Sequence, residues 1–225
     1  MAQKIAVFGK TPESEAELKK EIRKHGFAYD YLHPDIVISY GGDGTFLWAE
    51  RAYPSIPKAL FRYSTICKKC HNLPIHHALI LLKERRYKIE NHPKIRAGNL
   101  IATNDVVIRN KEPTHAVRFT LAINGKQMNK EFIGDGIVIA TPFGSTGYFY
   151  SITRKTFTKG LGIAFNNTTE EQKPLFIPAN STITLSLKRG TAVIAADNNP
   201  KLTELKPNKR VTIRTSKQKA SIITF

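Results

Sequence analysis

A glycine-rich segment, Gly41-Gly42-Asp43-Gly44-Thr45, constrains the fold of this chain more than any other feature. Residues 35–40 before it are rich in β-branched side chains, as in a buried strand, and residues 46–51 after it favour a helix. A tight glycine turn between a buried strand and a helix is typical of parallel α/β sheets, whose ligands bind at that edge. The segment therefore predicts an α/β fold with a ligand site at this turn.

The same segment has the features of an anion site. Glycines let backbone N–H groups approach phosphate oxygens, and the start of a helix favours negative charge. Asp43 would repel such a ligand, so its presence indicates a general base or a metal-binding carboxylate. The alternative is a tight turn in which aspartate only favours the turn geometry. The spacing fits neither the dinucleotide-binding G-x-G-x-x-G motif nor the P-loop.

Strand and helix patterns alternate through the first part of the chain. Residues 4–8 predict a strand, and Thr11 with Pro12 predicts the start of a helix that ends near Gly26. Residues 76–86 predict another helix. After about residue 93 the expected strands are 99–109, 116–123, 131–141, 181–188, 192–196 and 210–215.

Asn124-Gly125 predicts a hairpin between two of these strands, and residues 145–152 predict the one later helix. The sequence therefore predicts an α/β N-terminal domain with a parallel sheet over residues 1–93. A mostly β C-terminal domain is expected over residues 94–225, and a return of the last strand to the first domain stays open.

Composition bounds the class of protein. Of the 225 residues 41% are hydrophobic, which suffices for a packed core, and the formal net charge is +17. Such a charge attracts nucleic acid, nucleotides or polyphosphate. The Lys and Arg residues are scattered along the whole chain, so their distribution does not distinguish between these ligands. No apolar run is long enough to span a membrane, and the apolar run at the start is too short for a signal peptide. We therefore expect a cytoplasmic protein without a membrane partner.

A second cluster follows the expected strand at 131–141. It reads Thr141-Pro142-Phe143-Gly144-Ser145-Thr146-Gly147-Tyr148, a turn that opens a helix with hydroxyl groups beside an aromatic ring. Such a segment suits a base and a ribose, although a strand, a turn and a capped helix would explain it equally well. Thr103-Asn104-Asp105 places an amide and a carboxylate side by side near the start of a strand.

Taken together, these segments resemble the NAD kinase family in order and spacing. The resemblance covers roughly residues 35–200 and includes Gly41–Thr45, Asn104-Asp105, Asp135-Gly136 and the segment from Thr141 to Tyr148. Diacylglycerol and sphingosine kinases share the glycine-aspartate motif, whereas the T-P-x-G-S-T-x-Y segment is much more particular to NAD kinases. The resemblance implies phosphorylation of the adenosine-ribose 2′-hydroxyl of NAD, which gives NADP.

The resemblance also implies roles for single residues. Asp43 matches the catalytic aspartate that takes the proton from the 2′-hydroxyl, in a phosphate-binding turn formed by Gly41, Gly42, Gly44 and Thr45. It further implies a divalent cation such as Mg²⁺, ATP or polyphosphate as phosphoryl donor, and a homodimer or homotetramer. The positions that match NAD-binding residues of the family are Asn104, Asp105, Asp135, Thr146, Gly147, Tyr148, Ser151 and Asp197.

Some of these positions depart from the family pattern. Asp105 stands where most members have glutamate, and Asp135 matches a residue near the nicotinamide that is often reached from a neighbouring subunit. Phe143 replaces a small or polar residue, and Gly147 replaces alanine. Residues 61–71 take the place of a second glycine-rich turn and contain Cys67, Cys70 and His71.

The Cys67-Lys68-Lys69-Cys70-His71 segment leaves several interpretations open. Its spacing fits haem attachment, which would require export, and it could also form a zinc site with His76-His77 nearby. Ordinary thiols, or a disulfide if the source is a hyperthermophile, are the other interpretations. Because the segment replaces a turn that does not handle the transferred phosphoryl group, we expect it to be dispensable for catalysis.

Two alternatives to an NAD kinase remain. A lipid kinase of the same superfamily would need an exposed apolar or amphipathic stretch, which the sequence does not show. A basic protein that binds nucleotides or nucleic acid without catalysis would explain the charge, but the sequence lacks the aromatic-basic or helix-turn-helix motifs of nucleic-acid-binding domains. We therefore expect no specific nucleic-acid partner.

Overall fold

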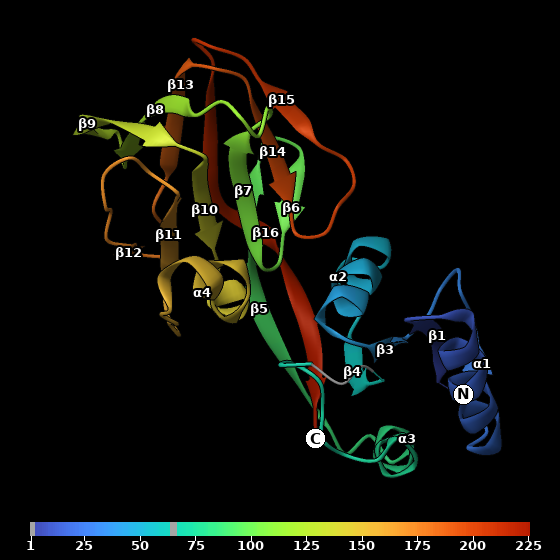
Figure 1. Cartoon of the computed structure of the whole chain (residues 1–225). Helices are drawn as coiled ribbons and strands as arrows, with labels where there is room; N and C mark the ends of the chain where they lie inside the picture. The colour runs from blue at the N-terminus through green and yellow to red at the C-terminus, as the bar shows by residue number, and fades with distance from the viewer. Residues whose placement is uncertain (1–2, 64–66) are drawn as a thin grey trace. The chain divides into compact units, whose positions relative to one another are not determined.

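The computed structural model describes residues 3–63 and 67–225 of the chain. It divides into two compact units (Figure 1): unit 1 comprises residues 1–92 and 218–225, and unit 2 comprises residues 93–217. The chain passes from one unit to the other within strand β5 (Lys88–Ala97) and again within strand β16 (Arg210–Thr224). Unit 1 is α/β and unit 2 is largely β, which confirms the expected fold class.

Unit 1 is built on a parallel sheet in the strand order β2-β1-β3-β4-β16. Its other elements are β1 (Lys4–Gly9), α1 (Pro12–Lys24), β2 (Ala28–Tyr29), β3 (Ile36–Gly41), α2 (Asp43–Ala52), β4 (Lys58–Arg62) and α3 (Ile75–Lys83). β1 lies between β2 and β3, so the direction of winding reverses beside β1. Such a reversal is where α/β sheets bind ligands, at the carboxyl ends of the strands.

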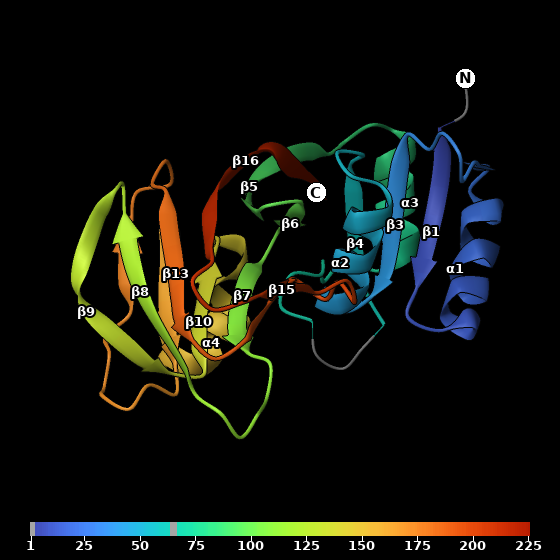
Figure 2. The same cartoon turned by 90° about the horizontal axis from the view of Figure 1, so that it is seen from above.

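The helices of unit 1 cover both faces of this sheet. Leu18 of α1 and Leu79 of α3 pack against Ile5, Ile38 and other side chains on one face. Ala49 of α2 packs on the opposite face. Figure 2 shows α1 lying along β1. Alternate residues of β1 and β3 therefore point to different helices, and these strands are apolar on both faces, as expected for a buried parallel sheet.

The first helix begins as its sequence predicts. The Thr11 hydroxyl accepts a hydrogen bond from the Ser14 N–H at 3.2 Å, and the Ser14 hydroxyl accepts one from the Thr11 N–H at 3.0 Å. Pro12 occupies the first helical position. Gly26 follows the helix with a φ of 72°, a conformation that glycine adopts without strain.

Unit 2 contains two sheets that enclose one core. The elements are β6 (Leu100–Ala102), β7 (Asp105–Asn110), β8 (Val117–Ile123), β9 (Lys126–Gly134), β10 (Gly136–Ala140), η1 (Phe143–Thr146), α4 (Tyr148–Thr153), β11 (Leu161–Asn166), β12 (Leu175–Ile177), β13 (Ile183–Arg189), β14 (Ala192–Ala196) and β15 (Thr203–Leu205). One sheet has the order β12-β11-β10-β7-β14-β15, and the other runs β16-β13-β8-β9.

The core of unit 2 lies between these sheets. Ile108 and Ile139 of the first sheet pack with Phe119 and Leu185 of the second. The opposite face of β7 and β10 carries Val107 and other apolar side chains, which pack with Phe149 of α4. Helix α4 therefore covers the outer face of the six-stranded sheet (Figure 1).

Some expected strands are divided or extended. The strand expected at 99–109 is two strands, β6 and β7, and the one expected at 131–141 is divided between β9 and β10. The second break lies at Asp135, directly before Gly136, whose φ is 126° and whose Cβ would lie 2.0 Å from the Ile108 carbonyl oxygen. The Asn124-Gly125 hairpin is confirmed, with φ values of 52° and 80°.

The sequence did not predict β2, β4, β5, β11, β12 and β15. Two of these, β12 and β15, have three residues each and carry little pattern. β5 is rich in charged residues and contains Pro93, which argues against a strand by composition. In the part of the chain that the structure describes, no helix is long and apolar enough to cross a membrane.

Candidate active site

The turn from Gly41 to Thr45 joins the carboxyl end of β3 to helix α2. Gly42 precedes the helix and Asp43 is its first residue. A Cβ at Gly41 would lie 2.1 Å from the Thr45 Oγ1, so only glycine fits there. The Thr45 hydroxyl in turn accepts a hydrogen bond from the Gly42 N–H at 3.4 Å. The turn therefore presents a half-buried carboxylate at the start of a helix, at the edge of the sheet where ligands bind.

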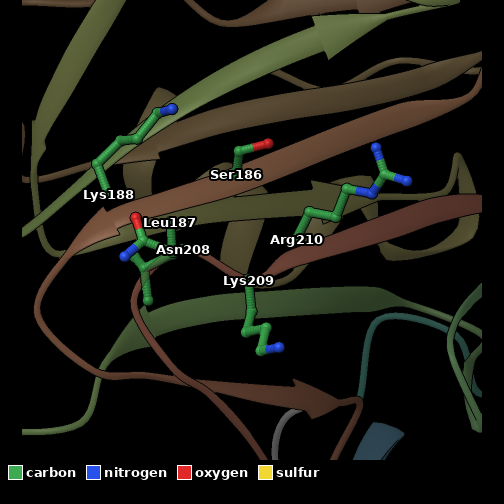
Figure 3. Close-up of a pocket in the computed structure, with 6 residues that line it drawn as sticks. All are labelled: Ser186, Leu187, Lys188, Asn208, Lys209 and Arg210. Carbon is green, nitrogen blue, oxygen red and sulfur yellow. The ribbon is translucent and has the colours of Figure 1, made fainter.

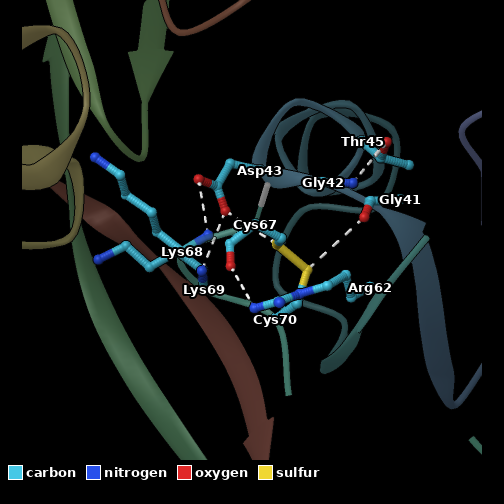
Figure 4. The surroundings of a disulfide bond; sticks show 9 residues. All are labelled: Gly41, Gly42, Asp43, Thr45, Arg62, Cys67, Lys68, Lys69 and Cys70. Carbon is cyan, nitrogen blue, oxygen red and sulfur yellow. Dashed lines mark hydrogen bonds between the residues drawn. A yellow bond between two sulfur atoms is a disulfide. The ribbon is translucent and has the colours of Figure 1, made fainter. Parts of the chain in front are cut away.

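A loop after β4 holds the Asp43 carboxylate. The Lys69 N–H donates to its Oδ1 at 3.2 Å, and the Lys68 N–H donates to its Oδ2 at 3.4 Å. The Cys67 Sγ lies 3.3 Å from the same Oδ1. Figure 4 shows the loop backbone against Asp43, with the lysine side chains extending away from the carboxylate. The burial of Lys69 lowers the pKa of its ammonium group, and the negative charge of Asp43 opposes that shift.

Cys67 and Cys70 are joined in a disulfide. Their sulfurs are then not thiolates, so this form offers no zinc site. Over the described residues no group of three or more His, Cys, Asp or Glu side chains could hold a metal ion. The His71 ring nitrogen Nε2 lies 2.7 Å from the Ile223 carbonyl oxygen, and the ring packs against both Phe61 and Phe225. His71 therefore has a structural place in unit 1.

These contacts bear on the expectation that the segment is dispensable for catalysis, which followed from its replacing a turn that does not handle the transferred phosphoryl group. In the structure Cys67, Lys68 and Lys69 contact Asp43 directly. The dispensability of the segment stays a prediction, which the cysteine variant described below tests. Nothing in the sequence places residues 67–69 beside residue 43, because the contact depends on how the loop after β4 returns to the end of β3.

A second group of predicted residues lies at one edge of the six-stranded sheet of unit 2. Asp105 begins β7 and pairs with Ala140, the last residue of β10, while Ala196 of β14 pairs with Val106. Asp197 directly follows β14. The antiparallel register therefore brings Asn104, Asp105 and Asp197 to the same edge.

Asp197 ties these strand ends together. Its carboxylate accepts hydrogen bonds from the backbone N–H groups of three successive residues, Thr103 at 2.7 Å, Asn104 at 2.8 Å and Asp105 at 3.2 Å. Burial raises the pKa of the Asp197 carboxyl to about 6, although these three donors and the charge of Lys94 act to lower it. Burial, and then the nearby Asp197, raise the pKa of the Asp105 carboxyl to about 7.

The segment after β10 packs onto Asn104. The Thr141 hydroxyl donates to the Thr103 carbonyl at 2.6 Å and accepts from the Gly144 N–H at 3.1 Å. A Cβ at Gly144 would lie 2.2 Å from the Asn104 carbonyl oxygen, which explains the glycine. The Asn104 side-chain oxygen is buried and has no hydrogen-bond partner among the described residues. Because buried polar atoms are usually paired, this oxygen is a candidate ligand contact.

Gly147 and Tyr148 stand next to this group. A Cβ at Gly147 would come within 4.0 Å of the Asp105 Oδ2 and 3.9 Å of the Asn104 Nδ2. Tyr148 begins α4, is 37% exposed, and its hydroxyl accepts a hydrogen bond from Asn166 at 3.3 Å. The structure therefore brings Asn104, Asp105 and Gly147 together, with Thr146 and Tyr148 in the adjoining turn.

Ser151 and Asp135 are placed differently. The Ser151 hydroxyl donates to the Tyr148 carbonyl at 2.7 Å within α4. Asp135 precedes β10, whereas Thr141 follows it, so a strand of five residues separates Asp135 from the Asn104 group within one chain. Asn110 and Asn167 each donate to its carboxylate, at 3.4 Å and 3.3 Å.

The cavity between β13 and the start of β16 contains none of the predicted residues. It has a volume of about 490 Å³ and is lined by Ser186, Leu187, Lys188, Asn208, Lys209 and Arg210. Figure 3 shows the charged ends of Lys188, Lys209 and Arg210 pointing in different directions. These cations do not converge on a single anion position, so the cavity does not compete with the Asp43 turn as a phosphate site.

Sequence reasoning missed Lys68 and Lys69, whose N–H groups hold Asp43, and Lys94, whose charge acts on Asp197. Lys68 and Lys69 are the unspecified positions of the Cys67–His71 pattern, and Lys94 belongs to no motif. A backbone N–H has no sequence signal, and Lys94 lies in the charged strand β5 that was itself missed.

A sequence model of the ATP-NAD kinase C-terminal domain matches residues 103–225. NAD kinase of Sulfurisphaera tokodaii is 31% identical over 99% of this chain and 95% of its own length. NAD kinase of Saccharolobus solfataricus is 28% identical over 93% of this chain and 87% of its own length.

Two solved structures share the fold. An NAD kinase from Archaeoglobus fulgidus, in complex with ATP, has a TM-score of 0.84 at 18% identity and covers 98% of this chain and 93% of its own. Yeast NADH kinase, in complex with NADH, has a TM-score of 0.87 at 14% identity, and the match covers 100% of this chain and 84% of the yeast chain. The family model matches more than half of the chain, and the Sulfurisphaera relative matches almost all of it, so the chain belongs to the NAD kinase family and is a phosphotransferase.

Proposed function

We propose that this protein phosphorylates the adenosine-ribose 2′-hydroxyl of NAD to give NADP, with Asp43 as general base. The observation that carries the proposal is the carboxylate inside an anion-binding turn. Asp43 begins α2 directly after Gly41-Gly42, at a helix start that also favours phosphate groups. Its negative charge opposes phosphate binding unless the carboxylate acts on the reacting hydroxyl.

The chemical step follows from this placement. The 2′-hydroxyl gives its proton to an Asp43 oxygen, its own oxygen forms a bond to the terminal phosphorus of the donor, and the bond to the leaving phosphate oxygen breaks. Gly41, Gly42, Gly44 and Thr45 supply the turn, and the N–H groups at the start of α2 offset the phosphate charge. The two loop N–H groups on Asp43 restrict its orientation, which favours transfer in line.

We assign NAD recognition to the residues at the edge of the six-stranded sheet. The unpartnered Asn104 Oδ1 would accept from the adenine amino group or a ribose hydroxyl, and Asp105 would accept a ribose hydroxyl bond. The Tyr148 ring, partly exposed beside Thr146, would stack on adenine. Asp197 would act through Asn104 and Asp105, because it holds their backbone. Asp135 and Ser151 keep their family roles as proposals, Asp135 toward a neighbouring subunit in a homodimer or homotetramer.

The donor and its cation complete the proposal. The Archaeoglobus relative binds ATP, which supports ATP as donor here, with polyphosphate as the second donor to be tested. Mg²⁺ usually binds through substrate phosphates and one or two carboxylates. The turn offers one carboxylate, Asp43, and so fits a cation carried mainly by the donor, which would neutralise charge on the transferred phosphoryl group. We place this reaction in the cytoplasm.

One assay tests the proposed function. The purified protein is incubated with NAD, Mg²⁺ and either ATP or polyphosphate, and the product is identified by an NADP-specific dehydrogenase. We expect NADP with ATP and none when Mg²⁺ is chelated. Absence of NADP with both donors would contradict the proposal, and NADP with polyphosphate alone would correct the donor.

A further inference from the structure

The two N–H groups that hold Asp43 belong to the residues between the disulfide-bonded cysteines. Lys68 and Lys69 stand between Cys67 and Cys70, and each donates to a different oxygen of the Asp43 carboxylate (Figure 4). The disulfide therefore closes a ring around the two donors. A ring of this size allows few conformations, so the directions of both N–H groups depend on the covalent closure.

Other bonds fix the ends of this loop to the sheet. Arg62, the last residue of β4, donates from Nη2 to the Cys67 carbonyl at 3.0 Å. The His71 N–H donates to the Leu60 carbonyl at 2.9 Å. The Cys70 Sγ lies 3.9 Å from the Gly41 carbonyl oxygen, in the turn that carries Asp43. The loop thus contacts both β4 and the Asp43 turn, and the disulfide closes the loop between these contacts.

We propose that the Cys67–Cys70 disulfide loop is a positioning device for Asp43, and that reduction of the disulfide slows phosphoryl transfer. The proposal rests on the proposed function, since it needs Asp43 to be the general base. Proton transfer is sensitive to displacements of about 1 Å, which can cost on the order of 100-fold in rate. Tight turns often need glycines, and the loop of residues 67–70 contains none. The disulfide instead holds this loop in the conformation that directs its N–H groups at Asp43.

A dithiol supplies the two electrons and two protons that reduction of the Cys67–Cys70 disulfide requires. Attack of a dithiol thiolate on one sulfur gives a mixed disulfide, and the second thiol of the reductant then displaces it. Cys67 and Cys70 gain two electrons and two protons, and the reductant becomes a cyclic disulfide. Cys-x-x-Cys pairs commonly exchange in this way. The chain contains two cysteines, so a dithiol acts on this disulfide and on no other.

The first experiment compares NADP formation by the oxidised protein, the protein reduced with dithiothreitol, and the Cys67→Ser/Cys70→Ser variant. We expect kcat to fall about 10- to 100-fold in the reduced protein and in the variant, with the KM for NAD changed by about twofold or less. Reoxidation should restore kcat. The variant is the matched control and should not respond to dithiothreitol. An unchanged kcat in both opened forms would overturn the proposal.

A second background separates positioning from a loss of structure. In Asp43→Asn, the residual rate should be the same with the disulfide open or closed, because the group that the loop positions is gone. If opening lowers the rate equally in both backgrounds, the disulfide acts on the fold and the positioning proposal is wrong. If Asp43→Asn itself keeps normal turnover, the proposed function of Asp43 fails instead, so the two failures are distinguishable.

Discussion

The carboxylates of the two units have opposite surroundings. In unit 1, Asp43 is half-buried at the start of a helix and accepts hydrogen bonds from two backbone N–H groups of a neighbouring loop. In unit 2, Asp105 and Asp197 are close enough for Asp197 to raise the pKa of Asp105, and burial raises both pKa values. The first setting places a partly exposed carboxylate beside a turn that suits phosphates. The second suits groups that shape a binding surface.

Hydrogen bonds between a carboxylate and backbone N–H groups have opposite roles in the two units. Backbone N–H groups orient Asp43, whereas at Asp197 the carboxylate orients the backbone of residues 103–105. Removing Asp43 should therefore abolish chemistry and leave the fold. Removing Asp197 should loosen the fold and, through it, the binding of NAD.

The largest effect is expected for Asp43→Asn, which keeps the size of the side chain but removes its basicity. Loss of a general base typically costs about 10²–10⁴ in rate, so NADP formation should fall by that factor. The melting temperature should stay close to that of the unmodified protein. Steady-state kinetics and thermal unfolding measure the two. Near-normal turnover would show that Asp43 is not the base.

Asp197→Ala should have the largest effect on stability. It leaves three backbone N–H groups without their acceptor, and each unsatisfied buried donor costs about 1–3 kcal/mol. We expect the free energy of unfolding to fall by roughly 3 kcal/mol in urea titrations, after allowance for water that reaches the site. Asp197→Asn is the matched control, because it keeps one acceptor oxygen and should lose less. Equal stability of Asp197→Ala and the unmodified protein would show that the hydrogen bonds to Asp197 do not stabilise the fold.

Asp105 should make stability dependent on pH. Its folded-state pKa, about 7, lies above the ordinary value of 3.8, so the folded form binds more protons than the unfolded form over that interval. Its contribution is therefore complete below the unfolded-state pKa and is lost as pH rises through about 7. Asp105→Asn should reduce the fall in melting temperature between about pH 4 and pH 7. Identical pH slopes for both proteins would contradict the raised pKa.

The smallest of these effects concerns Tyr148. Stacking on a base contributes about 1–3 kcal/mol, so Tyr148→Ala should raise the KM for NAD at least about fivefold. Tyr148→Phe keeps the ring and loses only the 3.3 Å bond from Asn166, so its KM should change little. Equal increases in both variants would indicate that the hydroxyl, and not the ring, recognises NAD.

Local signals predicted the parts of the fold that depend on neighbouring residues. The Thr11 cap, Pro12, the strand before Gly41 and the Asn124-Gly125 hairpin are all set within a few residues, and the structure has each of them. The breaks within the expected strands 99–109 and 131–141 escaped notice. The break at Asp135 is followed by Gly136, where Ile108 of a neighbouring strand approaches so closely that only glycine fits, and the local sequence does not contain that contact.

The motifs predicted which residues belong to the candidate site, but not which residues contact one another there. The NAD kinase motifs identified Asp43, Asn104 and Asp105 as site positions, and their roles stay predictions. The motifs did not indicate that Asp197 would bond the backbone of residues 103–105, because β14 reaches β7 only through the sheet register. Nor did they place the disulfide loop beside Asp43, because that segment departs from the family pattern.

We propose that Asp43 performs the chemistry while residues of unit 2 recognise NAD. Isothermal titration of NAD into Asp43→Asn separates these two roles, with Asn104→Ala as the comparison. We expect Asp43→Asn to bind NAD with a Kd within about threefold of the unmodified protein, whereas loss of a hydrogen bond in Asn104→Ala should weaken binding about tenfold. A Kd that rises in Asp43→Asn as far as turnover falls would contradict the division of roles.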